Sequence, residues 1–254
     1  MAGIYIHIPF CASRCNYCDF YSTTMLSKRN DYVKAVLREW KENAHDWKNN
    51  IDTIYIGGGT PSMLDEIDLT LLINTILEDL PHTPKEITLE ANPCDLTLDK
   101  LYCIKQTNIN RLSIGIQSFN DSLLTFMGRR HNSFQAMTAI TNAQNVGFEN
   151  ISIDLIYGIP NQTFNEWKQD IDQALLLRPQ HISAYCLTYE NGTKLNQLLL
   201  EGMIQPIEDT IENEMYDYLV NTLSKHNYLH YEVSNFALPS YESKHNSSYW
   251  THTP

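Results

Sequence analysis

Positive charge is scarce in this chain of 254 residues, which has 18 Lys and Arg against 30 Asp and Glu and a formal net charge of -12. Non-specific binding to nucleic acid depends on clustered basic side chains that displace counterions from phosphates. The composition therefore argues against a nucleic-acid partner.

Long hydrophobic runs are also lacking. The opening MAGIYIHIPF has no basic segment and too short an apolar run for a signal peptide, and no apolar stretch reaches the length of a membrane span. We therefore expect a cytoplasmic protein. Hydrophobic residues make up 43% and charged residues 19%, which is typical of a folded globular chain.

Cysteines are few, and their spacing does not suggest a disulfide framework. Three of the six are scattered, namely Cys94, Cys103 and Cys186. Such thiols are typical of buried side chains in a reducing compartment. The other three, Cys11, Cys15 and Cys18, lie within HIPFCASRCNYCDFYS at the spacing C-x3-C-x2-C.

Three adjacent thiols favour an iron–sulfur cluster over the other uses of cysteine. A structural zinc site needs four closed ligands, usually two pairs, and the chain has no second pair. Disulfides would leave one thiol over. A cubane held by three cysteines keeps one iron free for a non-protein ligand. A zinc site and purely structural thiols remain the alternatives.

The rest of the chain alternates between β-rich and amphipathic segments. The β-rich runs are 3–8, 51–59, 85–93, 109–117, 150–160 and 181–189, and helical periodicity appears at 27–47, 65–80, 97–106, 133–146, 164–177 and 207–227. This alternation is typical of βαβ units in a parallel sheet. We predict an α/β fold, a partial (βα)6 TIM-like barrel.

The domain organisation follows from the same pattern. We expect a core barrel over residues 1–235, with the cysteine loop at 9–22, and an aromatic, irregular tail at 236–254 that begins an incomplete C-terminal region. Exposed aromatics in that tail predict that the natural protein continues or that the tail folds back onto the barrel.

Polar residues stand where the predicted strands end. The runs end at the cysteine loop, at GGGT, at Glu90, at Gln117 and at Asp154. Barrel chemistry takes place at the carboxyl ends of the strands, so these groups are expected to meet at one rim. A single polar residue at a strand end is usually structural, but five successive ones favour a site.

The segment IYIHIPFCASRCNYCDFYS resembles the cluster loop of the radical S-adenosylmethionine (radical SAM) superfamily, and GGGTPS resembles its glycine segment. The resemblance implies a [4Fe-4S] cluster on the three cysteines, an S-adenosylmethionine chelated to the open iron, and reductive cleavage to a 5'-deoxyadenosyl radical. It also implies cofactor contacts from Tyr5, Gly58, Gly59, Thr60, Glu90, Gln117, Arg129 and Asp154, with Arg130 as the neighbouring alternative to Arg129.

Within its porphyrin-related branch the chain is similar to HemW-type haem chaperones and to oxygen-independent coproporphyrinogen III oxidases. The oxidases have a further cysteine where this chain has Phe20, which we also count as a candidate cofactor contact, and a longer segment before the loop. HNSSYW at 245–250 resembles the HNxxYW motif of the chaperones. These features favour the chaperones, with the oxidase as the alternative and enzymatic activity left open.

The resemblance to the chaperones implies haem as ligand, haem-acceptor proteins such as respiratory enzymes as partners, and a reducing electron donor. Any membrane association would be peripheral, through those acceptors. His245 is the candidate haem ligand because imidazole is a standard axial ligand; His7, Cys94 and His131 are alternatives. Family members continue well past the motif, whereas this chain stops four residues after Trp250, which predicts a fragment or a natural truncation.

Overall fold

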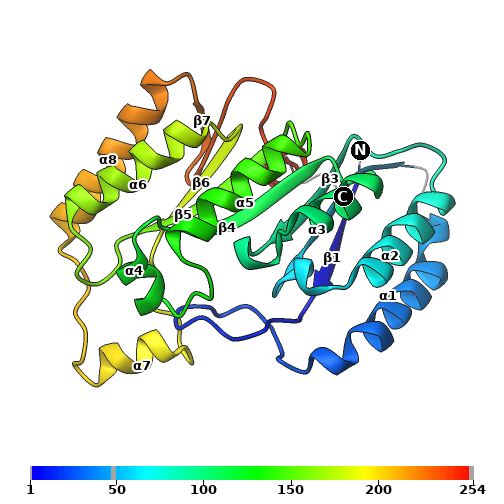
Figure 1. The fold of residues 1–254 in the computed structure, drawn as a ribbon, viewed down its shortest axis with the longest axis horizontal. Coiled ribbons are helices and arrows are strands. Elements are labelled where there is room, and N and C mark those ends of the chain that lie inside the picture. Colours follow the sequence, from blue (N-terminus) through cyan, green and yellow to red (C-terminus); the bar gives the residue numbers. More distant parts are fainter. Residues whose placement is uncertain (1, 47–49, 252–254) are drawn as a thin grey trace.

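A single curved sheet of eight strands forms the centre of the computed structural model, which describes residues 2–46 and 50–251 (Figure 1). The strands lie in the order β1-β2-β3-β4-β5-β6-β8-β7. They are β1 (Ala2–Ile8), β2 (Ile51–Gly58), β3 (Glu86–Ala91), β4 (Arg111–Gln117), β5 (Ile151–Tyr157), β6 (His181–Cys186), β7 (Leu229–Glu232) and β8 (Asn235–Ala237). The first six pair in parallel, and β8 joins β6 antiparallel.

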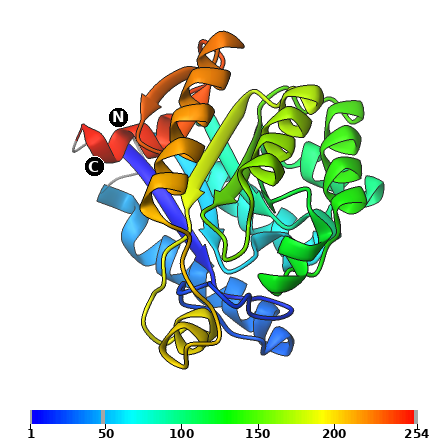
Figure 2. The same ribbon diagram turned by 90° about the vertical axis from the view of Figure 1, so that its left-hand side faces the viewer.

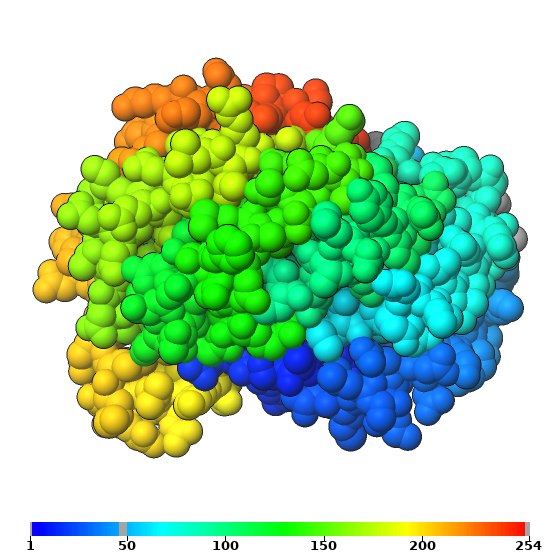
Figure 3. Space-filling model, in the orientation of Figure 1, coloured from blue at the N-terminus to red at the C-terminus, as the bar shows by residue number. Residues whose placement is uncertain are grey.

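Helices cover the outer, convex face of this sheet (Figure 2). In the space-filling view of Figure 3, the side chains of the cyan to yellow-green segments cover most of the face that is turned to the viewer. The α-helices are α1 (Arg29–Asn43), α2 (Glu66–Asp79), α3 (Leu98–Gln106), α4 (Asp121–Phe126), α5 (Ser133–Asn145), α6 (Phe164–Leu177), α7 (Lys194–Leu200), α8 (Asp209–Lys225) and α9 (Lys244–Trp250). Short 3₁₀ helices lie at Leu26–Lys28, Ala44–Asp46, Pro61–Met63 and Pro93–Asp95. None of the helices in the described part of the chain is long and apolar enough to cross a bilayer.

Alternation along each strand decides which face of the sheet is apolar. In β4, Leu112, Ile114 and Ile116 are fully buried in the hydrophobic core under the helices. The intervening Arg111 and Ser113 belong to the opposite face and line a cavity on the concave side. The inside of the open barrel is therefore polar, and the main core lies between the strands and the helices.

Local capping explains where two of the outer helices begin. Asn132 before α5 and Thr163 before α6 each accept a hydrogen bond from the backbone N–H three residues on. The side chains of Gln135 and Glu166 in turn accept one from the backbone N–H of the cap residue. These capping boxes satisfy amide groups that a helix start leaves unpaired.

The predicted six parallel strands with intervening helices are confirmed, in a sheet that does not close. The tail expected to be irregular instead completes β8, which forms a hairpin with the preceding β7, and forms α9, which packs against β2 and lies beside β1 (Figure 2). Helices α4 and α7 were not predicted, because six or seven residues are too few to show helical periodicity. Residue 47 of the predicted first helix and residues 252–254 of the tail lie outside the described residues.

Candidate functional site

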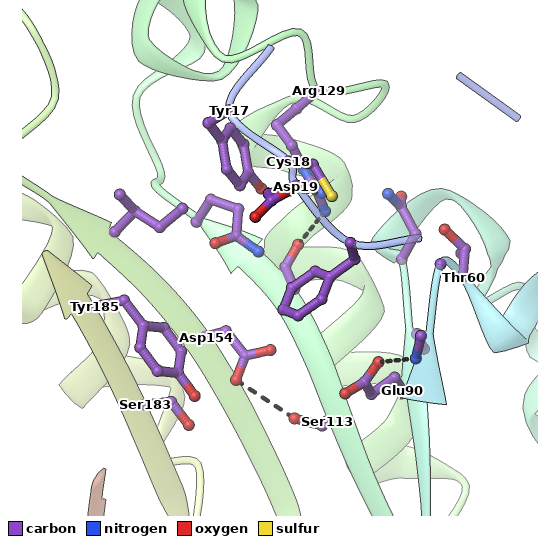
Figure 4. A pocket seen from close by; sticks show the side chains of 18 of the residues that line it. Tyr17, Cys18, Asp19, Thr60, Glu90, Ser113, Arg129, Asp154, Ser183 and Tyr185 are labelled. Atoms are coloured by element: carbon purple, nitrogen blue, oxygen red, sulfur yellow. Dashed lines mark hydrogen bonds between the residues drawn. The ribbon is translucent and has the colours of Figure 1, made fainter. Parts of the chain in front are cut away.

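A cavity of about 600 Å³ opens on the concave side of the sheet at the carboxyl ends of the strands (Figure 4). That volume is in the range of small-molecule sites. Its lining comes from the cysteine loop and from each of the strands β2 to β6; it includes Tyr17, Cys18, Phe20, Gly58, Gly59, Thr60, Glu90, Arg111, Ser113, Gln117, Arg129, Asp154, Ser183, Tyr185 and Asn246.

The loop of 9–22 is closed at its base by backbone hydrogen bonds. Cys11 N donates to Thr23 O at 2.9 Å, and Thr23 N donates to Pro9 O at 2.7 Å. Midway, Asn16 N donates to Met127 O at 2.9 Å, which ties the loop to the turn after α4. The three cysteines are thus held between the end of β1 and the segment that carries Arg129.

The three thiols are free and have polar neighbours from other elements. The Thr60 hydroxyl lies 3.4 Å from Cys11 Sγ, and Arg129 Nη1 lies 3.5 Å from Cys15 Sγ. Burial raises the pKa of the Cys18 thiol, and the neighbouring Cys15 and Cys11 raise it further. Thiolates at this loop would therefore be stabilised by a bound cation, which fits a thiolate-ligated cluster.

The arrangement does not form a single-ion site. Among residues 2–46 and 50–251, no three His, Cys, Asp or Glu side chains are placed to hold one metal ion. A closed structural zinc centre needs four such ligands around one ion. Three free thiols on one loop are the kind of donor set that binds an iron–sulfur cluster.

The glycine segment lies directly against the cysteine loop. A Cβ on Gly59 would approach Pro9 C to 2.9 Å and Cys11 Sγ to 3.0 Å. Gly58 has φ +118, which side chains rarely adopt, and its N–H donates to Glu90 Oε2 at 3.1 Å. Glycine is required here because the loop and a carboxylate approach the backbone closely.

Two carboxyl groups inside the cavity hold protons more tightly than usual. Burial raises the pKa of Glu90 to about 7, although the Tyr55 hydroxyl donates to its Oε1 at 2.8 Å. Burial likewise raises the pKa of Asp154 to about 6, and the Ser113 hydroxyl lies 3.4 Å from its Oδ1 (Figure 4). Such perturbed carboxyls in a cavity are typical of functional sites.

Gln117 and Arg129 meet at the end of β4. Gln117 has φ +71 beside a register irregularity between β4 and β5, and it lines the cavity. Strained backbone and bulges of this kind are common beside active sites. Arg129 Nη2 donates to Gly115 O at 2.6 Å, while its Nε is buried without a partner. The structure thus brings both predicted residues to the cavity.

Three of the predicted residues lie differently. Phe20 lines the cavity but is 73% exposed. Tyr5 stacks on Tyr55 at the open edge of the barrel and is outside the cavity lining. His245 is 3% exposed at the base of the barrel, with its ring stacked on Tyr55 at 5.1 Å. Of the HNSSYW segment, Asn246 is the residue that reaches the cavity.

Several lining residues were missed by the sequence analysis, which considered only strand ends. Arg111 lines the cavity from the start of β4, Ser113 and Ser183 from the middle of their strands, and Tyr185 from near the end of β6. These residues could have been found from the alternation of polar and apolar residues in RLSIGIQ and HISAYC, because alternate side chains of a strand point to the same face of the sheet.

Residues 5–174 match the family model described as the radical SAM superfamily. The chain belongs to this superfamily. Membership implies a [4Fe-4S] cluster and S-adenosylmethionine as cofactors, in agreement with the three cysteines and the cavity. The structure agrees with membership in its parallel, open sheet with the site at the strand ends.

Curated radical SAM relatives match nearly the whole chain. It is 39% identical to the haem chaperone HemW of Lactococcus lactis over 97% of this chain, 39% identical to that of Bacillus subtilis over 99%, and 35% identical to that of Escherichia coli over 98%. The chain spans 65%, 67% and 66% of those relatives' own lengths.

Among solved structures, the chain is similar to coproporphyrinogen III oxidase from Escherichia coli, with a TM-score of 0.84 and 24% identity. The alignment covers 95% of this chain and 56% of the oxidase. At that identity the likeness shows a shared radical SAM fold.

Proposed function

We propose that this protein is a haem chaperone, which binds haem and passes it to acceptor proteins while carrying a [4Fe-4S] cluster and exchangeable S-adenosylmethionine. The observation that carries the proposal is the 39% identity to curated haem chaperones along nearly the whole chain, against 24% to the oxidase. The acceptor proteins and a reducing electron donor belong to the proposal. The cytoplasm is the compartment we propose.

In this proposal the cluster binds to Cys11, Cys15 and Cys18, and the cavity beside it holds S-adenosylmethionine. When bound, these groups supply one-electron chemistry at a sulfonium carbon. Glu90 and Asp154 offer acceptors for amino and hydroxyl groups, and Arg129 offers a guanidinium fork for a carboxylate. Gly58, Gly59 and Thr60 form the wall between the cavity and the loop.

His245 is the proposed haem ligand. Burial lowers the pKa of its imidazole, which keeps the ring neutral as axial ligation requires. Both ring nitrogens have partners, because Nδ1 lies 2.9 Å from Thr53 Oγ1 and Nε2 lies 3.1 Å from the Tyr249 hydroxyl. Tyr249 is largely exposed, so a rotation of that side chain would free Nε2.

Oxygen-independent coproporphyrinogen III oxidation is the second candidate. It is favoured by the similarity of the whole fold to the oxidase and by the buried carboxyls of the cavity. Against it, the position two residues after Cys18 is Phe20, where the oxidases have a further cysteine.

The test is anaerobic reconstitution with iron and sulfide, quantification of both, and then haem titration of the same sample. We expect four irons and four sulfides per chain within experimental error, followed by a saturable Soret-band shift. Cys15→Ala should abolish the cluster, whereas Cys103→Ala, outside the cavity, should retain it. His245→Ala should weaken haem binding, with exposed His226→Ala as its control.

Three results would contradict the proposal at different points. If anaerobically purified protein contains zinc but no iron or sulfide, the assignment of a [4Fe-4S] cluster is contradicted. If the Soret band of haem does not shift when haem is mixed with the protein, the haem-chaperone function is contradicted. Turnover of coproporphyrinogen III to protoporphyrinogen IX would establish the second candidate instead.

A further inference from the structure

One charged side chain of the cavity has no partner. Arg111, the first residue of β4, is 1% exposed and lines the cavity. Its Nε and Nη1 are buried without a hydrogen bond, and within the described residues its guanidinium makes no ion pair. A buried guanidinium is unfavourable unless acceptors or an anion satisfy it, and it stays protonated at any ordinary pH.

The nearby acids do not supply that anion. Glu90 is occupied by the Tyr55 hydroxyl and the Gly58 amide, and burial raises its pKa to about 7. Glu86 accepts from the backbone N–H groups of Lys244 and His245 at 3.0 and 2.9 Å. Asp154 is contacted by Ser113, and burial raises its pKa to about 6. The positive charge of Arg111 lowers the pKa of Glu90 and of Asp154, but within the described residues neither carboxyl forms an ion pair or a hydrogen bond with its guanidinium.

The surroundings favour an incoming negative charge. His181 is fully buried between Ser152 and Tyr231, and burial together with the Arg111 charge lowers the pKa of its ring. His245 behaves in the same way. Among the described residues, Arg111 and Arg129 are the two cations that line the cavity, and Arg111 has two buried N–H groups without an acceptor.

Arg111 is also well separated from the cluster end of the cavity. Arg129 is fixed beside Cys15 and donates to Gly115 O. Gly115 lies four residues after Arg111 on β4, which corresponds to roughly 13 Å along the strand. Both guanidinium groups line the cavity, and Figure 4 shows Arg129 beside Cys18, with Asp154 and Ser113 farther from the cysteine loop.

We propose that Arg111 binds a carboxylate of the ligand that fills this cavity, through a forked, charge-assisted contact at the inner end. The chemistry fits an acidic small molecule: we propose a propionate of a tetrapyrrole, and the carboxylate of S-adenosylmethionine, whose proposed place is the cluster end of the cavity, is the other outcome of the test. The choice of these two probes rests on the proposed function.

The experiment compares each acid with a neutral analogue. Dissociation constants are measured anaerobically for haem and haem dimethyl ester, and for S-adenosylmethionine and its decarboxylated form. The proteins are the native full chain, Arg111→Gln, Arg111→Lys and the control Arg38→Gln, an exposed arginine of α1. Arg111→Gln should raise the dissociation constant of the acid on the order of 10- to 100-fold and change that of its neutral analogue by no more than about 2-fold.

The variants separate the outcomes. Selective loss of haem assigns the subsite to a propionate, and selective loss of S-adenosylmethionine assigns it to the amino-acid carboxylate. The affinity of Arg111→Lys for the acid should lie between that of native protein and that of Arg111→Gln, because lysine keeps the positive charge but loses the forked pair of N–H donors. Arg38→Gln should equal native for all four ligands.

Two results would overturn the inference. One is equal loss of acid and neutral analogue in Arg111→Gln, which indicates general damage to the cavity. The other is no loss for either acid. If Arg111→Gln does not fold, two other measurements test the inference. They are the dissociation constants of the Arg111→Lys variant and the ratio between the native protein's affinities for each acid and for its neutral analogue. If the native protein binds no haem, the proposed haem-chaperone function is contradicted. The role of Arg111 is then tested only by the binding of S-adenosylmethionine and its decarboxylated form.

Discussion

At the scale of single residues, burial controls the chemistry of this cavity. Glu90 comes from a strand end that the sequence alone marked as polar, and the fold surrounds it with Tyr55, Gly58 and the neighbouring Asp154. Removal from water disfavours the carboxylate more than two hydrogen bonds favour it. The result is an acid that titrates near neutral pH.

The raised pKa of Glu90 makes stability depend on pH. The folded state binds this proton more tightly than the unfolded state. The stabilisation that results is therefore fully present below pH 4.5 and is lost as pH rises through about 7. The loss is about 3 kcal/mol, because each pKa unit corresponds to about 1.4 kcal/mol. Glu90→Gln should remove this dependence.

Urea unfolding of native protein and Glu90→Gln at pH 4.5, 5.5, 6.5 and 8 measures the effect. The variant should gain stability relative to native as pH rises. A constant difference across the series would contradict the raised pKa. Glu149→Gln, a residue of the connection before β5, serves as the charge-matched control.

At the scale of elements, local signals fix the ends of the outer helices. Thr163 Oγ1 accepts from Glu166 N at 3.2 Å, and Glu166 Oε2 accepts from Thr163 N at 2.8 Å. Both residues are near the start of α6, outside the cavity lining. Stability and ligand binding should therefore be separable at this site.

Thr163→Ala should destabilise the protein by about 1 kcal/mol, because the hydroxyl no longer accepts from Glu166 N or donates to Glu166 Oε2. The urea midpoint should fall with an unchanged slope, and cluster content should stay native. Thr138→Ala in the middle of α5 is the control, and alanine's higher helix propensity should leave stability equal or slightly higher. An unshifted midpoint for Thr163→Ala would show that the capping box contributes nothing.

At the scale of the whole molecule, the tail closes the base of the open barrel. Glu86 of β3 accepts from the backbone N–H groups of Lys244 and His245 at the start of α9, and Gly3 of β1 leaves room for the His245 ring. Residues more than 150 positions apart are thus joined by one buried carboxylate. The same contact holds the first turn of α9, which carries His245.

Glu86→Gln should destabilise the chain by about 1 to 3 kcal/mol, because a charged acceptor of two amide groups is lost inside the barrel. Limited proteolysis between residues 238 and 251 should accelerate, while the rest of the chain stays resistant. Glu242→Gln, whose side chain lies outside this contact, should digest as native does. Equal digestion of native and Glu86→Gln would show that α9 is held by its packing alone.

Sequence reasoning predicted the parts of the fold whose signals are local. The six parallel strands and the longer helices follow from periods of 2 and 3.6, and the strand ends at or next to Gly58, Glu90 and Gln117 were predicted. Asp154, which was expected at a strand end, lies in the middle of β5. Short elements such as α7 and β8 escaped, because their few residues fit several structures equally well. Their positions depend on packing against strands far away in the chain.

The sequence by itself determined the radical SAM loop, its three thiols and the glycine segment, because these require particular residue types at particular spacings. Only the tertiary structure decided that Arg111 faces the cavity without a partner and that His245 is enclosed beside Tyr55. Both facts depend on which side of a strand or helix meets a distant element. Charge and burial of that kind arise only when the sheet curves and brings those elements together.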